Sequence, residues 1–468
     1  MPRPADDVRR VIKAYDVRGL VGAEIDEAFV FEVGAAFARL MRDEGASGSG
    51  RVVIGHDMRE SSPVLSAAFA GGVVDEGLDV VRIGLASTDE LYFASGLLNC
   101  PGAMFTASHN PAAYNGIKLC RAQAKPVGED TGLAIIRDQV IDGVPAGRGR
   151  TGPRGRQHDQ DVLDDYGRFL RSLVDVGGLR PLRVAVDAGN GMAGHTAPAV
   201  LGTVPALTLL PLYFELDGSF PNHEANPLEP ANLVDLQNFV RETGADIGLA
   251  FDGDADRCFV VDENGDPVSP SAVTALVADR ELARDPGASV IHNLITSRVV
   301  PEVIAERGGV AVRSRVGHSY IKALMAQTGA VFGGEHSAHY YFRDFWGADS
   351  GMLAGLHVLS ALGGQDRPLS ELMGFYHRYA ASGEINFRVE DATASVDAVV
   401  KAFAAQTVST DSLDGMTVDL GDGAWFNLRT SNTEPLLRLN VEARTADEVD
   451  RIVTRAAERI AAGGGTGR

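Results

Sequence analysis

Residues 51–84 have the sequence RVVIGHDMRESSPVLSAAFAGGVVDEGLDVVRIG. They open with an apolar run closed by a glycine, which is typical of a buried strand. Ser62 and Pro63 then predict the cap and first turn of a helix, and Gly77 follows its last turn. One face of that helix would carry Val64, Leu65, Ala68, Phe69 and Val73. A second apolar run at 80–83 completes a strand–helix–strand unit, which favours a parallel sheet.

The same alternation recurs up to about residue 375. Strands are predicted at 182–186, 246–251, 289–291 and 310–312, with helices near 231–242 and 298–307. Later strands are predicted at 384–389, 416–420, 424–428 and 436–441, with helices near 395–406 and 446–461. These later strands follow one another through short turns, which indicates an α+β domain with an antiparallel sheet.

The length of 468 residues suggests about three or four domains. Residues 143–157 hold five glycines and four arginines without apolar periodicity, which indicates a linker. A dinucleotide-type glycine pattern inside it is accidental, because no strand leads into it and Pro153 interrupts any helix. The glycine-rich tail at 463–468 is expected to be disordered. We expect domains at 1–145, 158–257, 258–373 and 374–468.

The composition excludes several classes of protein. A formal net charge of −20 would repel nucleic acid and anionic membranes. Three cysteines in a long chain do not form a disulfide framework. No run of about 18 apolar residues predicts a membrane span, and no secretion signal opens the sequence. We therefore expect a cytoplasmic protein that binds neither nucleic acid nor membrane; the oligomeric state stays open.

The segment Thr106-Ala-Ser-His-Asn-Pro111 sets Ser108 beside His109 between small residues and a proline. Such a rigid turn would present one hydroxyl, although a capped turn without chemistry is the commoner meaning of a Ser-His pair. The chain lacks the Gly-x-Ser-x-Gly elbow in which hydrolases usually place a serine. Lys118 follows at the end of Tyr114-Asn-Gly-Ile-Lys118.

The segment Asp252-Gly-Asp-Ala-Asp-Arg257 follows directly after a predicted strand. Alternate side chains of an extended segment share a face, so Asp252, Asp254 and Asp256 would converge. Three carboxylates at such short range need a cation, and hard divalent ions such as Mg²⁺ or Ca²⁺ take oxygen ligands. Open α/β sheets tend to bind ligands at this end of a strand.

A calcium EF-hand loop is the alternative, because the three aspartates and Glu263 occupy its first, third, fifth and twelfth positions. The sixth position, normally glycine, is Arg257, and the flanking helices are missing. A solvated acidic turn is a further alternative. We favour a three-carboxylate Mg²⁺ site.

The segment Gly333–His339 places Glu335, Ser337 and His339 at alternate positions. From one side of a strand-like loop they could hydrogen-bond neighbouring sugar hydroxyls, and a polar strand end is the plain alternative. A zinc site from two histidines and Glu335 is weaker, because no other His or Cys cluster accompanies it.

The segment Arg429-Thr-Ser-Asn-Thr-Glu-Pro435 gathers an arginine, hydroxyls and an amide in one tight loop. It resembles a phosphate cradle, although a hydrophilic hairpin turn has a similar composition. Arg18, within Tyr15–Gly19, and His318 are further basic positions, and neither indicates a site by itself.

Together, and in this order, these segments resemble the α-D-phosphohexomutases, the family of phosphoglucomutases and phosphomannomutases. The matching segments are Tyr15–Gly19, Thr106–Pro111, Asp252–Arg257, Gly334–His339 and Arg429–Thr433, so the resemblance covers nearly the whole chain. It implies three related mixed α/β domains and a C-terminal α+β domain, similar to the TATA-binding protein, around a central cleft.

The resemblance also implies roles for the matched residues. Ser108 would carry the phosphoryl group and bind Mg²⁺ together with Asp252, Asp254 and Asp256. Phosphoryl and proton transfer would involve Arg18, His109, Lys118 and Arg257. Substrate would be bound by Tyr15, His318, Glu335, Ser337, His339, Arg429, Ser431, Asn432 and Thr433. Two positions depart from the family pattern: Leu294, near which relatives carry a lysine, and Ala255, where glycine is often found.

We therefore expect a Mg²⁺-dependent mutase of small hexose phosphates with a hexose 1,6-bisphosphate as intermediate and activator. The sugar-loop sequence favours a phosphomannomutase that converts mannose 6-phosphate to mannose 1-phosphate. A phosphoglucomutase or dual-specificity enzyme is the alternative, and phosphoglucosamine mutase is a more distant one. A sugar-phosphate phosphatase would need water to reach phospho-Ser108. An idle sugar-phosphate-binding protein would not need the serine, the metal ligands and the phosphate loop together.

Overall fold

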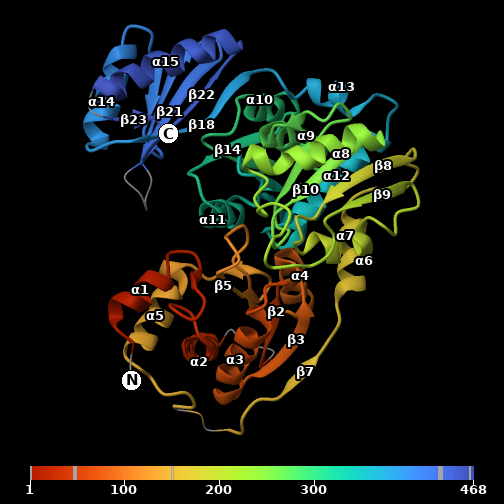
Figure 1. Ribbon diagram of the computed structural model, residues 1–468, viewed down its shortest axis with the longest axis vertical. Helices are drawn as coiled ribbons and strands as arrows, with labels where there is room; N and C mark the ends of the chain where they lie inside the picture. The colour runs from red at the N-terminus through yellow and green to blue at the C-terminus, as the bar shows by residue number, and fades with distance from the viewer. Residues whose placement is uncertain are drawn as a thin grey trace. The chain divides into compact units, whose positions relative to one another are not determined.

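The computed structural model describes residues 3–45, 50–148, 150, 152–430, 436–462 and 465–467 (Figure 1). It divides into two compact units. The first unit comprises Met1–Val268 and Ser337–Ser370, and the second comprises Ser269–His336 and Glu371–Arg468. None of the described helices combines the length and the apolarity that a membrane span needs.

The N-terminal part of the first unit forms a mixed sheet. Its elements are α1 (Ala5–Val11), β1 (Val17–Leu20), α2 (Glu27–Asp43), β2 (Arg51–His56), α3 (Ser62–Asp75), β3 (Asp79–Leu85), α4 (Thr88–Leu98), β4 (Gly102–Phe105), β5 (Tyr114–Arg121), β6 (Lys125–Pro126), η1 (Glu129–Thr131), α5 (Leu133–Ile141) and β7 (Gln157–Asp159). The strand order is β1-β5-β4-β2-β3-β7, with β6 paired to β5. Strands β4, β2, β3 and β7 are parallel, and β5 is antiparallel to both β4 and β1. The turn between β4 and β5 therefore lies at the carboxyl end of a parallel strand.

Helix α3 is the helix predicted after residue 61, but its start differs in detail. Ser62 is its first residue, and the Ser62 hydroxyl donates to Asp57 instead of capping the helix. The hydrophobic face is buried at Leu65, Phe69 and Val73, whereas Val64 is 47% exposed.

A second sheet completes most of the first unit. Its elements and the helices around it are α6 (Leu163–Leu173), β8 (Leu182–Asp187), α7 (Ala193–Val200), β9 (Leu207–Leu212), η2 (Pro230–Leu233), α8 (Val234–Thr243), β10 (Ile247–Phe251), β11 (Cys258–Val261) and β12 (Pro267–Val268). The same unit also contains β16 (Tyr340–Phe342), η3 (Arg343–Phe345), β17 (Ala348–Asp349) and α12 (Gly351–Gly363); β16 and β17 pair antiparallel and are not strands of this sheet. The order is β12-β11-β10-β8-β9, with β10, β8 and β9 parallel and β11 antiparallel to β10. The acidic segment 252–257 connects β10 to β11.

The second unit begins with three parallel strands in the order β14-β13-β15. Its elements up to this point are α9 (Pro270–Arg284), β13 (Ser289–Asn293), α10 (Val299–Glu306), β14 (Val310–Ser314), α11 (His318–Thr328) and β15 (Phe332–Gly334). Helix α13 (Leu369–Gly374) spans the division between the units.

The C-terminal part of the second unit is the predicted antiparallel α+β domain. Its elements are β18 (Ala380–Arg388), α14 (Ala392–Phe403), β19 (Ser409–Asp411), β20 (Met416–Gly421), β21 (Ala424–Thr430), β22 (Leu436–Ala443), α15 (Ala446–Ala462) and β23 (Thr466–Gly467). The strand order is β19-β20-β21-β22-β18-β23, and every pair is antiparallel. Helices α14 and α15 pack on this sheet (Figure 1). The expected disorder of the tail is wrong for Thr466 and Gly467, which pair with β18.

The predicted fold class is confirmed: the chain is a multidomain α/β protein with an α+β C-terminal domain. The boundaries at 1–145, 158–257, 258–373 and 374–468 stay a prediction.

Candidate active site

Ser108 lies in the turn between β4 and β5, where that turn meets the loop between β10 and β11. Its backbone has φ +49°, and the residue is 6% exposed. Its Oγ donates a hydrogen bond to Asp252 Oδ2 at 2.8 Å. Gly253 permits this approach, because a Cβ there would lie 2.5 Å from the carbonyl oxygen of Ser108. Two loops recognised separately in the sequence therefore come together within the first unit.

The three aspartates of the acidic loop are buried and converge. One ligand atom from each of Asp252, Asp254 and Asp256 lies within 4.8 Å of the others. The extended conformation expected for this segment is wrong, because the Ala255 N–H closes a turn onto the Asp252 carbonyl at 3.0 Å. Ala255 has φ +59°, a conformation that glycine adopts more readily than alanine.

Lys118, on β5, neutralises one side of this cluster. Its Nζ donates to Asp254 Oδ2 at 2.7 Å and to Asp256 Oδ2 at 2.6 Å. The Oδ1 atoms of both aspartates are buried and have no hydrogen-bond partner among the described residues. Buried carboxylate oxygens without a partner are costly, and a site made only of such oxygens suits a hard divalent cation. The residues present therefore fit the Mg²⁺ that the sequence predicted.

Burial and the neighbouring charges shift the pKa values of these aspartates. Burial raises the pKa of Asp256 to about 6, and the neighbouring charge of Asp254 adds to the effect. Burial also acts on Asp254, but the contact with Lys118 outweighs it and holds the pKa of Asp254 below its usual range. A cation bound among these groups would favour their ionised forms.

His109 stands between the serine and a buried arginine. Arg257 Nε donates to Asp252 Oδ2 at 2.9 Å, and its Nη2 donates to His109 Nδ1 at 2.6 Å. Burial lowers the pKa of His109 to about 2, and the positive charge of Arg257 contributes. Because a guanidinium only donates, Nδ1 of this neutral imidazole is an acceptor. Ser108 Oγ lies 3.3 Å from the same nitrogen, whose single lone pair already accepts a hydrogen bond from Arg257.

Arg18, on β1, borders the serine loop. Its Nη1 donates to the Ala107 carbonyl at 3.2 Å and to Asn110 Oδ1 at 2.5 Å, and its Nη2 donates to Asp16. Tyr15 is nearby in sequence and 39% exposed. A guanidinium held in this way brings a fixed positive charge to the loop that carries Ser108.

Family models agree with this arrangement of segments. They match residues 9–141 as phosphoglucomutase/phosphomannomutase alpha/beta/alpha domain I, 164–265 as domain II, 269–379 as domain III and 384–459 as the C-terminal domain. The chain belongs to the phosphoglucomutase/phosphomannomutase family. It is therefore a phosphohexomutase, an isomerase of the kind that the sequence motifs predicted.

Individual relatives span nearly the whole phosphohexomutase. A protein of Xanthomonas campestris pv. campestris named phosphohexose mutases is 42% identical over 436 residues, which cover 92% of this chain and 94% of the relative. The phosphomannomutase of Escherichia coli K12 is 38% identical over 441 residues, with the same coverage of each chain. A crystal structure of a phosphoglucomutase/phosphomannomutase family protein from Burkholderia thailandensis superposes with a TM-score of 0.86 at 31% identity and covers 97% of each chain.

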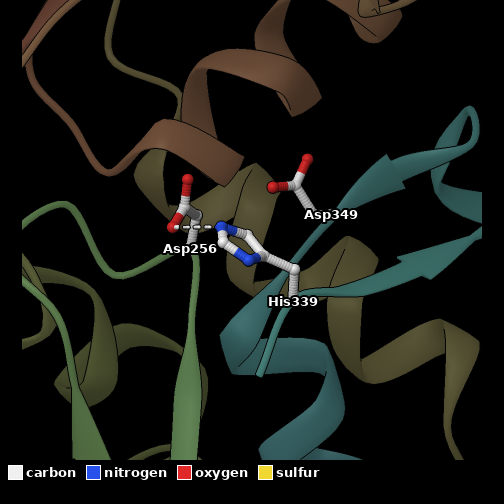
Figure 2. A group of neighbouring side chains, drawn as sticks. All are labelled: Asp256, His339 and Asp349. Atoms are coloured by element: carbon white, nitrogen blue, oxygen red, sulfur yellow. Dashed lines mark ion pairs between the residues drawn. The ribbon is translucent and has the colours of Figure 1, made fainter. Parts of the chain in front are cut away.

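His339 lies beside the acidic cluster of this phosphohexomutase. Its Nε2 is 3.8 Å from Asp256 Oδ1, and its Nδ1 is 3.1 Å from Ser337 Oγ. Figure 2 shows the imidazole flanked by Asp256 and Asp349, and one ligand atom from each of the three residues lies within 4.8 Å of the others. The predicted strand-like alternation is wrong, because the chain turns before His339 and Ala338 has φ +64°.

The remaining predicted substrate residues belong to the second unit. Glu335 accepts hydrogen bonds from Asn293 Nδ2 at 3.3 Å and from the Gly317 N–H at 3.2 Å, directly before His318 begins α11. Arg429 and Arg438 lie opposite each other on β21 and β22. Ser431, Asn432 and Thr433 lie outside the described residues. Leu294 is 3% exposed.

Thr88 is a contact of the acidic loop that sequence reasoning missed. Its Oγ1 donates to Asp254 Oδ2 at 2.6 Å, and its N–H donates to the Asp254 carbonyl at 3.0 Å. Ser87 caps α4, which leaves the Thr88 hydroxyl available for the aspartate. A Ser-Thr pair before a helix gave no sign of this contact, because helix capping explains both residues.

His223 supplies a test of the pH dependence of folding. Its Nε2 lies 3.1 Å from Asp187 Oδ2. Burial disfavours the charged imidazolium, but the hydrogen bond with Asp187 outweighs burial and raises the pKa of His223 above 6.5. A raised folded pKa contributes stability below the unfolded pKa, and this stability is lost as pH rises through the folded pKa. We expect His223→Gln to destabilise the protein more at about pH 5.5 than at about pH 8.5, as measured by urea unfolding. Equal losses at both values would contradict the assignment.

Proposed function

We propose that this phosphohexomutase interconverts mannose 6-phosphate and mannose 1-phosphate, with Ser108 as the phosphoryl carrier and Mg²⁺ as the cofactor. The observation that carries the proposal is the 2.8 Å contact of Ser108 Oγ with Asp252, beside the buried Oδ1 atoms of Asp254 and Asp256 that lack hydrogen-bond partners among the described residues. The name of the Escherichia coli relative supports mannose as the sugar.

Transfer would occur in two half-reactions. In the first, a hydroxyl oxygen of the sugar phosphate forms a bond to phosphorus as the bond from phosphorus to Ser108 Oγ breaks. The hydroxyl loses its proton, and the serine oxygen gains one. The product of this step is a hexose 1,6-bisphosphate, which returns its other phosphate to Ser108 in the second. Catalytic amounts of the bisphosphate would keep Ser108 phosphorylated.

The chain's own groups would position the reactants and balance their charge. Phosphoryl transfer needs in-line placement and neutralised oxygens more than covalent help. When bound by the three aspartates, Mg²⁺ would supply positive charge to the phosphate oxygens. Arg257, Lys118 and Arg18 would add fixed positive charge around the serine loop. His339 and His109 are the neighbouring candidates for proton transfer, and His109 would have to break its contact with Arg257 to take part through Nδ1.

The sugar and its second phosphate would be held elsewhere in the chain. Glu335 and Ser337 would accept or donate hydrogen bonds to ring hydroxyls, and His318 and Tyr15 would add contacts. Arg429, with Ser431, Asn432 and Thr433, would bind the phosphate that is not being transferred. An arginine supplies the planar fork that phosphate recognition uses. Because this loop would contact the phosphate and not the sugar ring, it could bind a phosphate at either end of the sugar, as the two half-reactions require.

A substrate panel tests the choice of sugar. With Mg²⁺ and a hexose 1,6-bisphosphate primer, we expect kcat/KM for mannose 1-phosphate to exceed that for glucose 1-phosphate by about tenfold, the range available from one repositioned hydroxyl contact. Glucosamine 1-phosphate should be the poorest of the three. A preference for glucose would contradict the assignment, and release of free phosphate faster than isomer formation would indicate a phosphatase.

A further inference from the structure

Arg59 is a buried arginine, 1% exposed, that lies three residues after the end of β2 and binds the loop carrying Ser108. Its guanidinium makes five hydrogen bonds: Nε to Asp57 Oδ2 at 3.2 Å, Nη1 to the carbonyls of Pro111 at 2.9 Å and Tyr114 at 3.0 Å, and Nη2 to the carbonyls of Ser108 at 2.9 Å and Asn110 at 2.7 Å. An arginine has five N–H donors, so all of them are used. Three of the five acceptors belong to the loop between β4 and β5, and a fourth is the carbonyl of Tyr114, the first residue of β5.

That loop needs such a partner. Between β4 and β5 it has no regular secondary structure to satisfy its carbonyl groups. Ser108 has φ +49°, a backbone conformation that costs free energy for a residue with a side chain and persists only where the surroundings enforce it. The hydrogen bond from Arg59 to the carbonyl of Ser108 acts on this residue directly.

The guanidinium is itself fixed from two sides. Asp57 accepts from the Arg59 side chain and from its N–H at 3.0 Å. Phe220 places its ring 5.2 Å from Arg59 Cζ, and a Cβ at Gly218 would lie 2.7 Å from Arg59 Cα. Arg59 therefore cannot swing away from the loop without disturbing both neighbours.

We propose that Arg59 is a positioning residue for phosphoryl transfer, which sets the direction of Ser108 Oγ through the loop carbonyls and without touching the substrate. The inference rests on the proposed role of Ser108 as phosphoryl carrier. Lysine cannot replace Arg59, because it offers three donors and no planar fork. In Arg59→Lys at least two of the five acceptors would lose their partner.

The test is Arg59→Lys, compared with Arg171→Lys. Arg171 lies on α6 and donates to the carbonyls of Ala199 at 2.7 Å and Val200 at 3.1 Å, so the control removes the same kind of contact elsewhere. We expect kcat of Arg59→Lys to fall by about 100-fold, the effect of misplacing a reacting group by about 1 Å, with KM changed less than about threefold. Affinity for Mg²⁺, measured by calorimetry, should stay near that of the wild type. Arg171→Lys should keep its kcat.

A wild-type kcat in Arg59→Lys, or an increase in KM alone, would overturn the proposal. If Arg59→Lys does not unfold cooperatively, Asp57→Asn is the variant to measure. It removes the charge that anchors the guanidinium and leaves the loop carbonyls available to Arg59. A kcat lowered by about tenfold would support the proposal, and an unchanged kcat would overturn it. Hydrogen exchange separates this inference from the proposed function. The amides of Ser108, Asn110 and Tyr114 should exchange faster in Arg59→Lys than in Arg171→Lys even if the wild type never carries phosphate on Ser108.

Discussion

Ser108→Ala is expected to lower steady-state mutase activity by at least about 10⁴-fold, because removal of the group that forms the covalent intermediate leaves no acceptor for the phosphoryl group. The fold should persist, since the hydroxyl makes no contact that the core requires. The variant should still bind mannose 6-phosphate, which equilibrium binding would detect. Activity and thermal unfolding measured on the same preparation separate loss of chemistry from loss of structure.

The control for this variant is Ser172→Ala. Ser172 is an exposed serine on α6 whose Oγ donates to the Phe169 carbonyl at 2.7 Å. Its replacement should leave activity unchanged. Near wild-type turnover in Ser108→Ala would remove the covalent intermediate from the mechanism, whatever the effect on stability.

Asp254→Asn is expected to weaken Mg²⁺ binding and activity by at least roughly 100-fold, the upper range observed for partners of metal ligands. The carboxylate receives hydrogen bonds from Lys118 and Thr88 on Oδ2, and Oδ1 remains for the cation. An amide at this position brings no negative charge. It would also leave Lys118 with one carboxylate partner instead of two. Calorimetric titration with Mg²⁺ measures the first effect, and kcat/KM at saturating Mg²⁺ measures the second.

The matched substitution is Asp266→Asn, in an exposed turn after β11. It should bind Mg²⁺ as the wild type does. Treatment of the wild type with a chelator should abolish activity, and added Mg²⁺ should restore it. Wild-type Mg²⁺ affinity in Asp254→Asn would show that the acidic loop does not hold the ion.

The spacing of apolar residues predicted most helices and strands, because each segment carries in its own sequence the apolar face that it buries in the core. The strand expected at 246–251 is β10, and the helix expected at 446–461 is α15. The failures depend on contacts that periodicity does not record. Ser62 lies in the first turn of α3, and its hydroxyl donates to Asp57 instead of capping the helix. The tail forms β23 because the edge of β18 is available to pair with it, which no local pattern records.

In the candidate active site, too, local patterns could be recognised in the sequence and contacts between distant segments could not. Ser108 and the three aspartates could be found because each stands in a short, distinctive segment. Their meeting could be inferred only from the family resemblance, and the structure shows it through one hydrogen bond. Thr88 and Arg59 escaped notice because their local sequence has ordinary explanations. Each contributes only through residues far along the chain, so their part in the site depends on the fold.

The most direct test of the account is to locate the transferred phosphate in the wild-type protein. The enzyme is incubated with a hexose 1,6-bisphosphate carrying labelled phosphate, and its peptides are mapped by mass spectrometry before and after addition of unlabelled mannose 1-phosphate. We expect the label on Ser108 alone, and we expect it to move to the sugar during the chase. Label on another residue, or active turnover with no label on Ser108, would contradict the account.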